Sequence, residues 1–459
     1  MFLKNGGIIY TRPFWTSFFV FKEGIKMKVL KFGGSSLADA QQFKKVKNIV
    51  LADENRKYVI VSAPGKGLKS KHKITDLLLM CYQLSSHGLN FHEVYGIIED
   101  TYKNIVKDLG LGVDIDKILN DIFINIQNGG SLEYTSSRGE YINGIIMADF
   151  LGWNFVDPKN IIFFKDGKLD EAKTEQKIKE VFVKKEYSVI PGFYGIDENG
   201  QIKTFSRGGS DVTGSVIANG LVADIYENWT DVSGFLVADP KIVKNPKTIK
   251  NITYKELREL SYMGAPVLHE DAILPVKKHG IPINIRNTND PENDGTTIIG
   301  NYNGEVSNNI TGVAGRKGFT FITIEKTFMN TDFGFLRKLM SVFETNEISI
   351  EHMPSSIDSV SVVVESGKIA EKLKKLIEEI RIYTNPDSIT VENEMALIAI
   401  VGKGMVKKKG TSSKIFSALA QKNINIRMIN QGSSELNIII GIEQEDFEKA
   451  IKAIYKGFY

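Results

Sequence analysis

A pair of glycines directly after a short apolar run constrains this chain more than any other feature. The run covers residues 27–30, and the stretch Lys31-Phe32-Gly33-Gly34-Ser35-Ser36 follows it. Apolar residues then recur every three or four positions up to residue 50, which predicts a strand, a tight turn and a helix. Because glycine has no Cβ, a ligand can approach the backbone, and free N–H groups at a helix start attract phosphates. The stretch therefore suits a phosphate, although a plain strand-to-helix turn with a surface lysine is the simpler alternative.

Polar and glycine clusters also follow the later predicted strands. Residues 58–61 are a short apolar run that ends in Ser62-Ala63-Pro64-Gly65, so the first strand, helix and second strand make a βαβ unit. A second glycine pair, in Ser206-Arg207-Gly208-Gly209-Ser210-Asp211, precedes an apolar helix. Parallel sheets bind ligands at the carboxyl ends of their strands. We therefore expect the clusters to lie along one rim of a sheet: 31–36, 62–65, 207–213 and 230–234.

Two further segments are expected near this rim. Residues 66–73 are rich in lysine and predict a mobile basic loop over the site, with the next helix beginning at Ile74-Thr75-Asp76. The motif Ser136-Ser137-Arg138-Gly139-Glu140 is expected directly before another helix.

The last third of the chain contains an internal repeat. Gly334 is followed fourteen residues later by Ile348, and Gly410 stands in the same relation to Ile424. Each copy predicts a strand, a glycine, a helix and two more strands. We expect two small α+β modules that are stable only when paired with each other or with another subunit.

Composition excludes several classes of function. The chain has 459 residues with 58 Lys+Arg and 55 Asp+Glu, a balance that argues against a dedicated nucleic-acid binder. Its one cysteine, Cys81, fits a reducing cytoplasm. The six histidines have no zinc-ligand spacing, and no apolar run approaches the roughly 20 residues that span a bilayer. Residues 1–26 are predicted to be a loosely attached extension before a start at Met27, with a membrane or partner anchor as the alternative.

Four motifs in this order, followed by the repeat, resemble aspartate kinase, of the amino-acid kinase superfamily, with its tandem C-terminal ACT modules. The motifs are Lys31-Phe32-Gly33-Gly34-Ser35-Ser36, Ser137-Arg138-Gly139-Glu140, Ser206-Arg207-Gly208-Gly209-Ser210-Asp211 and Trp229-Thr230-Asp231-Val232. The resemblance implies an α/β fold, an open, mainly parallel sheet with helices on both faces, followed by two α+β ACT modules. The implied domains are an extension at 1–26, a catalytic domain at 27–302 and a regulatory region at 303–459. The modules would cover about 319–390 and 391–459, with 303–318 interleaved.

The resemblance implies MgATP-dependent phosphorylation of the L-aspartate β-carboxylate to 4-phospho-L-aspartate, the first step towards lysine, threonine and methionine. A homoserine dehydrogenase domain, which some relatives carry, does not fit in 459 residues. The β-carboxylate has a pKa of about 4, so no general base is needed. The task is to hold two anions in line and to neutralise the transferring phosphoryl group. We assign Lys31 and Asp211 as catalytic residues, and Gly33, Gly34 and Ser35 to the phosphates of ATP.

An amino-acid substrate needs a cation for its α-carboxylate and carboxylates for its ammonium. Arg207 can grip a carboxylate in two parallel hydrogen bonds. Glu140 and Asp211 are the candidates for the ammonium, and the resemblance implies that Ser62 and Thr75 lie close by. The alternative for Glu140 is a carboxylate that the dipole of a helix N-terminus favours.

The nucleotide loop departs from the family pattern. Thr230 and Asp231 match residues that contact the nucleotide, and Asp231 could help to place Mg²⁺ or its waters. Leu236, Lys241 and Pro266 stand where the family often has tyrosine, arginine and lysine. We keep Leu236 and Lys241 as nucleotide contacts, but Pro266 has no N–H and no side-chain donor.

The resemblance also implies an effector site in the first ACT module. Its residues are Met329, Asp332, Phe335, Leu336, Ile350, Glu351, Ser355 and Ser356. Asp332 or Glu351 would neutralise the side-chain ammonium of lysine, and threonine is the second candidate effector. Such sites lie between subunits, so a homodimer through the ACT modules is expected, with a tetramer as the further option. Phe335, Leu336 and Ile350 are alternatively core residues.

Two other functions remain open from the sequence. One is a different amino-acid kinase, which the ACT pair and the Ser-Arg-Gly-Glu motif argue against. The other is a catalytically inactive amino-acid sensor, which the retention of Lys31, Arg207 and Asp211 argues against.

Overall fold

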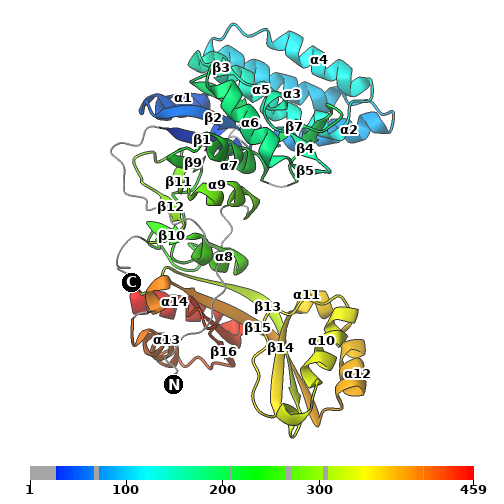
Figure 1. Cartoon of the computed structure of the whole chain (residues 1–459), viewed down its shortest axis with the longest axis vertical. Helices are drawn as coiled ribbons and strands as arrows, with labels where there is room; N and C mark the ends of the chain where they lie inside the picture. Colours follow the sequence, from blue (N-terminus) through cyan, green and yellow to red (C-terminus); the bar gives the residue numbers. More distant parts are fainter. Residues whose placement is uncertain are drawn as a thin grey trace, which may run out of the picture.

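The computed structural model describes residues 27–66, 72–206, 208–264, 268, 270–302, 309–406 and 408–459. The predicted extension at 1–26, most of the predicted basic loop, Arg207 and Pro266 lie outside the described residues. The molecule is elongated, with a large sheet wrapped by helices at one end and a smaller sheet at the other (Figure 1). Between them lie β10 (Asn251–Thr253) and α8 (Tyr254–Tyr262).

The large sheet has eight strands among the described residues. In spatial order they are β10, β12 (Thr296–Ile299), β11 (Ile283–Asn287), β9 (Ile225–Thr230), β1 (Lys28–Phe32), β2 (Arg56–Val61), β6 (Ser188–Pro191) and β3 (Asn154–Phe155). Neighbouring strands are parallel except for β11 and β12. The open, mainly parallel sheet is therefore confirmed.

Helices cover both faces of this sheet because the side chains of each strand alternate between two cores. On β1, Val29 packs in one core, and Leu30 and Phe32 pack in the other. Helices of the Val29 core are α6 (Glu171–Phe182), α7 (Gly209–Leu221), α8 and α9 (Leu274–His279). Helices of the Phe32 core are α1 (Ala40–Leu51), α2 (Ile74–Ser86), α3 (His92–Leu109), α4 (Ile115–Gln127) and α5 (Leu132–Leu151).

β1 lies at the point where the chain changes direction across the sheet. From β1 the chain continues to β2 and β6 on one side, and it later returns to β9 and β11 on the other. The carboxyl ends of parallel strands at such a point diverge and leave a ligand crevice. The predicted phosphate turn follows β1 directly, so the topology places this turn at the crevice.

The second sheet is antiparallel and lies at the opposite end of the molecule. Its spatial order is β14 (Ser359–Glu365), β13 (Gly312–Glu325), β15 (Ser388–Val401), β17 (Asn437–Glu443) and β16 (Met428–Asn430). Its longer helices are α10 (Phe335–Thr345), α12 (Leu373–Thr384), α13 (Thr411–Ala420) and α14 (Phe447–Phe458), and α11 (Ser366–Ile369) is a short one. Gly334 and Gly410 each precede a repeat helix with φ of 83° and 86°, a conformation that favours glycine.

The two halves of this sheet share strands. The first half of β13 pairs with the end of β15, beside β17, whereas the second half of β13 lies between β14 and the start of β15. Each repeat copy therefore contains part of both long strands. The copies also differ, since the chain after α10 makes isolated bridges where the second copy forms β16. The module boundaries stay a prediction.

Shorter elements connect the main ones. Two hairpins pair β4 (Phe164–Lys165) with β5 (Lys168–Leu169), and β7 (Tyr194–Ile196) with β8 (Ile202–Thr204). The 3₁₀ turns are η1 (Gly34–Leu37), η2 (Pro158–Asn160), η3 (Glu270–Ala272), η4 (Met329–Thr331), η5 (Lys403–Val406) and η6 (Gln444–Asp446). Within the described ranges, no helix has both the length and the apolar character that crossing a bilayer takes.

Candidate active site

Lys31 and Asp211 meet at the carboxyl end of β1. The Lys31 Nζ lies 2.6 Å from Asp211 Oδ1, and the lysine is only 8% exposed. Asp211 stands in the first turn of α7 and also accepts a hydrogen bond of 2.9 Å from Asn228 Nδ2. The alternative of a surface lysine is therefore wrong, because neighbouring strands and α7 enclose the side chain.

Asn228 is a site neighbour that sequence reasoning missed. It pairs with Lys31 in the register of β1 and β9, and its amide orients the same Asp211 oxygen that contacts the lysine. The available signal was the polar pair Glu227-Asn228 inside the strand that leads to Trp229 and Thr230.

Gly33 and Gly34, the two glycines of the turn after β1, are needed for different structural reasons. A Cβ on Gly34 would lie 2.7 Å from the Ala63 carbonyl oxygen, so only glycine lets this turn pack against the loop after β2. A Cβ on Gly33 would lie 3.6 Å from Lys31 Nζ, so glycine here leaves the space beside the ammonium open. The Gly33 N–H donates to the Trp229 carbonyl at 2.9 Å. This N–H is therefore already used within the protein.

The turn enters a 3₁₀ helix before the predicted α-helix. η1 covers Gly34–Leu37 and includes Ser35, and α1 begins at Ala40 after the Asp39 side chain accepts from Gln42 N at 3.0 Å. This cap sets the start of the α-helix.

The loop after β2 contacts α5 closely. Asn143 Nδ2 donates to the Ser62 carbonyl at 2.7 Å, and Ala63 N–H donates to the Glu140 carboxylate. A Cβ on Gly139 would lie 2.6 Å from the Ala63 Cβ, which explains a glycine inside a helix.

α2 begins at Ile74 as predicted, so Thr75 lies in its first turn, and Ile74 N–H donates to the Pro64 carbonyl at 3.2 Å. Ser62 is therefore part of the loop that contacts Glu140, and Thr75 lies at the start of the helix that this loop contacts.

Glu140 lies in the interior of α5. The prediction that its motif precedes a helix is wrong, because Ser131 caps the helix by accepting from Tyr134 N at 3.1 Å. The alternative of a dipole-stabilised carboxylate is also wrong, since the dipole effect is limited to the first turn. Burial raises the pKa of Glu140 to about 7, although the Ala63 N–H, Arg138 and Lys31 oppose this rise. Among the described residues, its Oε2 has no hydrogen-bond partner.

The second glycine pair brings α7 against the loop after β6. A Cβ on Gly209 would lie 2.3 Å from the Phe193 ring, and a Cβ on Gly192 would lie 2.5 Å from the Ser210 hydroxyl oxygen. Gly208 takes φ of 57° as the N-cap of α7. This contact holds the start of α7, and with it Asp211, beside the ends of β1 and β9.

The predicted nucleotide residues spread along the segment after β9. Thr230 ends β9, and its hydroxyl donates to the exposed Asp231 carboxylate at 3.2 Å. Leu236 forms a bridge with Thr248, and the exposed Lys241 follows farther along the chain. Thr230 and Asp231 lie at the strand rim, whereas Leu236 lies in the connection towards the second sheet.

The described part of the chain contains no group of three or more His, Cys, Asp or Glu side chains that could hold a metal ion. Cys81 is buried, and burial raises the pKa of its thiol to about 12, so it is an inert core residue.

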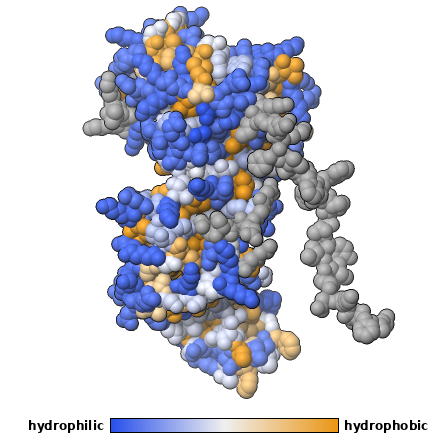
Figure 2. Space-filling model, turned by 90° about the vertical axis from the view of Figure 1, so that its left-hand side faces the viewer, coloured by the Kyte–Doolittle hydropathy of each residue, from blue (hydrophilic) through white to orange (hydrophobic). Residues whose placement is uncertain are grey.

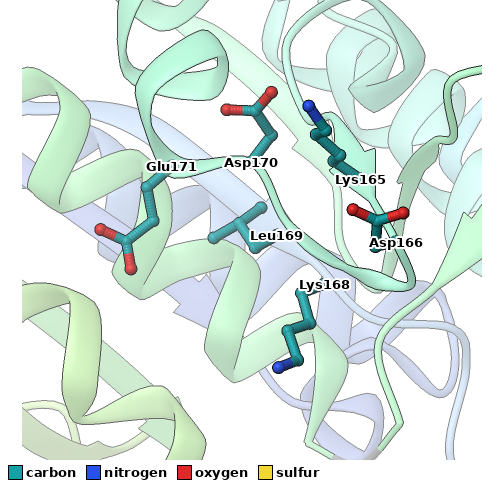
Figure 3. A pocket seen from close by; sticks show the side chains of 6 residues that line it. All are labelled: Lys165, Asp166, Lys168, Leu169, Asp170 and Glu171. Atoms are coloured by element: carbon teal, nitrogen blue, oxygen red, sulfur yellow. The ribbon is translucent and has the colours of Figure 1, made fainter.

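An open hollow on the β4–β5 hairpin is separate from this site. Its lining residues are Lys165, Asp166, Lys168, Leu169, Asp170 and Glu171. Figure 3 shows that its charged side chains point in different directions. Ligand sites have a mainly apolar wall with a few converging polar groups. This hollow has neither feature, and it includes none of the predicted site residues.

The predicted effector residues do not form one cluster of free side chains. Phe335 and Met329 are buried in the core of the first module, and Ile350 packs partly against it, but Leu336 is 40% exposed. The core alternative is therefore correct for Phe335 and Ile350 and wrong for Leu336.

The two carboxylates among the effector candidates already have side-chain partners, whereas Ser355 and Ser356 make backbone contacts. Asp332 forms an ion pair with Lys326, and Glu351 accepts a hydrogen bond from the Tyr262 hydroxyl of α8. Ser355 bridges Val360, and Ser356 N–H donates to the Ser359 carbonyl at 2.7 Å.

Comparisons with known proteins follow the same division of the chain. Residues 26–287 match the amino acid kinase family, and residues 398–458 match an ACT domain. The chain is 37% identical to Aspartokinase 3 of Bacillus subtilis, a match that covers 94% of this chain and 99% of that protein.

Solved structures of aspartate kinases are also similar to this chain. Clostridium acetobutylicum aspartate kinase, described as an allosteric enzyme, is 55% identical with a TM-score of 0.88, over 95% of this chain and 100% of that one. E. coli aspartokinase III is 25% identical. Its complex with aspartate and ADP has a TM-score of 0.68 over 94% of this chain and 99% of that one. Its complex with lysine and aspartate has a TM-score of 0.71 over 95% and 100%.

Proposed function

This chain belongs to the aspartate kinase family, and on that premise we propose how its residues transfer the γ-phosphoryl group of MgATP to the β-carboxylate of L-aspartate. The products are 4-phospho-L-aspartate and ADP. The observation that carries the proposal is the buried Glu140 carboxylate with an unpartnered oxygen, in a site that also holds Lys31. The Glu140 oxygen can accept a hydrogen bond from the ammonium of aspartate, and the Lys31 ammonium can neutralise phosphate charge of ATP. The two groups therefore match the two substrates of this reaction.

The chemistry requires positioning more than proton transfer. The β-carboxylate of aspartate, with a pKa of about 4, is already a nucleophile at neutral pH. Catalysis then consists of holding acceptor and donor in line and of neutralising charge on the transferring group. A fixed ammonium supplies that charge without reorganisation at the moment of transfer.

On the donor side, Lys31 contacts the phosphates of ATP and Asp211 positions it. The ion pair of 2.6 Å and the Asn228 hydrogen bond to Asp211 hold the lysine at the end of β1. The space beside Gly33 admits a phosphate oxygen to the lysine. Gly34 and Ser35 complete this turn, and Thr230, Asp231, Leu236 and Lys241 continue the nucleotide site. The ADP complex of E. coli aspartokinase III supports a nucleotide in this family.

Mg²⁺ accompanies the nucleotide. Mg²⁺ is typically held by one or two carboxylates together with substrate phosphates and waters. The exposed carboxylate of Asp231 is a hard oxygen donor at the strand rim and fits such a role. When bound, the ion neutralises phosphate charge.

On the acceptor side, the Glu140 carboxylate receives the α-ammonium of aspartate, with Ser62 and Thr75 nearby. The unpartnered Oε2 is an acceptor in need of a donor, and an ammonium supplies one. Arg207 is the proposed partner of the substrate α-carboxylate.

The C-terminal region gives this enzyme feedback control and a dimer interface. We assign its allosteric effector as lysine, with threonine as the second candidate, and this regulation suits the first step towards lysine, threonine and methionine. The lysine complex of E. coli aspartokinase III supports the effector. Phe328, Phe333 and Ile357 of the first module are 72%, 98% and 66% exposed, which supports a partner subunit. In Figure 2, hydrophobic residues gather at the lower tip of the molecule, the end that this module forms in Figure 1.

Hydroxylamine trapping tests both the reaction and the proposed role of Lys31. Wild type with L-aspartate and MgATP should form the hydroxamate of the acyl phosphate, and Lys31→Ala should lower kcat by about 10²–10³-fold because it removes a preorganised cation. Lys57→Ala is the matched control. Lys57 is also a lysine on a strand and pairs with a carboxylate, Glu186 at 2.5 Å, but it stands at the amino end of β2, away from the carboxyl ends where the site lies. Its rate should stay within about twofold.

Three results would overturn parts of this proposal. Hydroxamate absent from wild type would favour an amino-acid sensor. Hydroxamate that forms from L-glutamate instead would indicate a different amino-acid kinase. A product that forms equally fast with Lys31→Ala would remove only the role of this lysine.

A further inference from the structure

Three buried oxygens on α5 lack a hydrogen-bond partner among the described residues: the Thr135 hydroxyl, Glu140 Oε2 and Asn143 Oδ1. The last two stand three residues apart, and their residues are 6% and 0% exposed. Residues i and i+3 of a helix are neighbours on its surface. Glu140 is part of the proposed substrate site, whereas the Asn143 side chain makes a structural contact, its hydrogen bond to Ser62.

Both side chains bind the same peptide group of the loop after β2. Asn143 Nδ2 donates to the Ser62 carbonyl at 2.7 Å, and the N–H of the next residue, Ala63, donates to the Glu140 carboxylate. The carbonyl acceptor determines the orientation of the Asn143 amide, because only its NH₂ end can donate to it. The amide oxygen must therefore face away from the loop.

The pair of free oxygens is an unusual feature of a protein interior. Buried polar atoms are almost always hydrogen-bonded, and an exception calls for a ligand, a water or a functional reason. Both atoms here are acceptors, so the missing group must be a donor. A primary ammonium offers three N–H groups and carries the charge that the Glu140 carboxylate attracts.

We propose that Asn143 Oδ1 is the second acceptor for the α-ammonium of L-aspartate, beside Glu140 Oε2. Asn143 then selects an amino dicarboxylate over a dicarboxylate that lacks the amino group, while its NH₂ end fixes the Ser62–Ala63 peptide. This inference rests on the proposed aspartate site at Glu140.

Two variants of Asn143 separate the acceptor from the loop contact. Asn143→Leu removes both the acceptor oxygen and the donor to Ser62, whereas Asn143→Asp keeps an acceptor oxygen and loses the donor. The measured quantity is the KI of succinate as a competitive inhibitor divided by the KM of L-aspartate, since succinate is aspartate without its ammonium. We expect Asn143→Leu to lower this ratio by about 10- to 100-fold, as loss of a hydrogen bond to a charged group implies. Asn143→Asp should keep the ratio at or above the wild-type value.

A purely structural Asn143 gives a different pattern. Both variants would then raise the KM of aspartate and the KI of succinate by equal factors, and an unchanged ratio in Asn143→Leu overturns the proposal. Asn219→Leu is the control, because Asn219 is also a buried helical asparagine, bonded to Glu175 at 2.9 Å on α7. It should leave the ratio unchanged.

A double-mutant cycle with Glu140→Gln gives a second reading that does not depend on succinate. Two oxygens on one ammonium should couple, so the combined loss in kcat/KM should differ from the product of the single losses by about threefold or more. A loss equal to that product contradicts the proposal. If Asn143→Leu does not fold, Asn143→Ala removes the same oxygen without added bulk. An inactive wild type would instead overturn the proposed function.

Discussion

The Glu140 carboxyl group is buried where a charge is costly, and one of its oxygens has no partner within the described part of the chain. Desolvation disfavours the ionised form, which raises its pKa to about 7 despite the Ala63 N–H and the nearby Arg138 and Lys31. This arrangement lowers the free energy of unfolding, and it leaves a carboxylate oxygen that can bind a cation. Functional sites often hold groups of this kind.

Glu140→Gln should therefore stabilise the protein at pH 8 but not at pH 5. The pKa of Glu140 is about 7 in the folded state against a reference value of 4.5. Between these values the folded state binds more protons than the unfolded chain, so the free energy of unfolding of wild type falls as the pH rises. The amide has no such dependence, and we expect a gain of about 2–3 kcal/mol at pH 8 in urea unfolding. The KM of aspartate should rise in the same variant.

Glu133→Gln is the control for this prediction. Glu133 lies on the same helix but is partly exposed and forms an ion pair of 3.1 Å with Lys203. This variant should gain no stability at pH 8 and lose at most about 1 kcal/mol. An equal gain for Glu140→Gln at pH 5 and pH 8 would show that the ionised carboxylate is not the cause.

At the scale of elements, the contact between α5 and the loop after β2 holds the residues of the proposed acceptor side of the site. Gly139 allows this contact because its missing Cβ leaves room for Ala63. The helix thus brings Glu140 and Asn143 to one peptide group, and the loop in turn packs against Gly34 of the turn after β1. The acceptor and donor sides are therefore joined through backbone packing.

Gly139→Ala should separate these elements. An added Cβ at 2.6 Å from the Ala63 Cβ overpacks the contact, and we expect a loss of about 1–3 kcal/mol in the free energy of unfolding and a lower kcat/KM. Gly96→Ala is the matched control within α3, because no atom of the described residues lies within 4 Å of its Cβ position. It should stabilise the protein by about 0.5–1 kcal/mol. Equal effects of both variants in thermal unfolding would contradict this account.

At the scale of the whole molecule, α8 joins the two sheets. Buried Glu256 accepts from Thr311 Oγ1 at 2.6 Å and from Lys403 N at 2.8 Å, both in the C-terminal region. Near the end of α8, the Tyr262 hydroxyl donates to Glu351 of the proposed effector site. The segment after β9 is connected as well, since Val313 N–H donates to the Val237 carbonyl at 2.7 Å. An effector at Glu351 would thus act directly on a helix of the catalytic part.

Tyr262→Phe should increase sensitivity to the effector. The phenol occupies a Glu351 oxygen that the proposed effector ammonium needs, so its removal frees the acceptor. Loss of one competing hydrogen bond corresponds to a decrease of about 2- to 10-fold in the lysine concentration that halves the rate. The rate without lysine should stay unchanged, because Tyr262 does not contact the active site residues described above. A higher half-inhibitory concentration would show that this hydrogen bond supports effector binding.

The exposed aromatic residues of the first module predict a dimer that one charge can weaken. Phe333 is 98% exposed, so Phe333→Asp should shift the protein from dimer towards monomer in sedimentation velocity. Val183→Asp provides the control, since Val183 is 84% exposed at the end of α6 in the catalytic part. A Phe333→Asp dimer as tight as wild type would place the interface elsewhere.

The sequence by itself determined the order of strands and glycine turns, the sheet class and the repeat, because apolar periodicity and motif spacing are local properties of the chain. It also identified Lys31, Asp211 and Glu140 as candidates. Only the tertiary structure decided what surrounds them. The Asn143–Ser62 and Tyr262–Glu351 contacts join residues 81 and 89 positions apart. The unpartnered state of Glu140 Oε2 likewise depends on every element packed around it, and no local pattern encodes that.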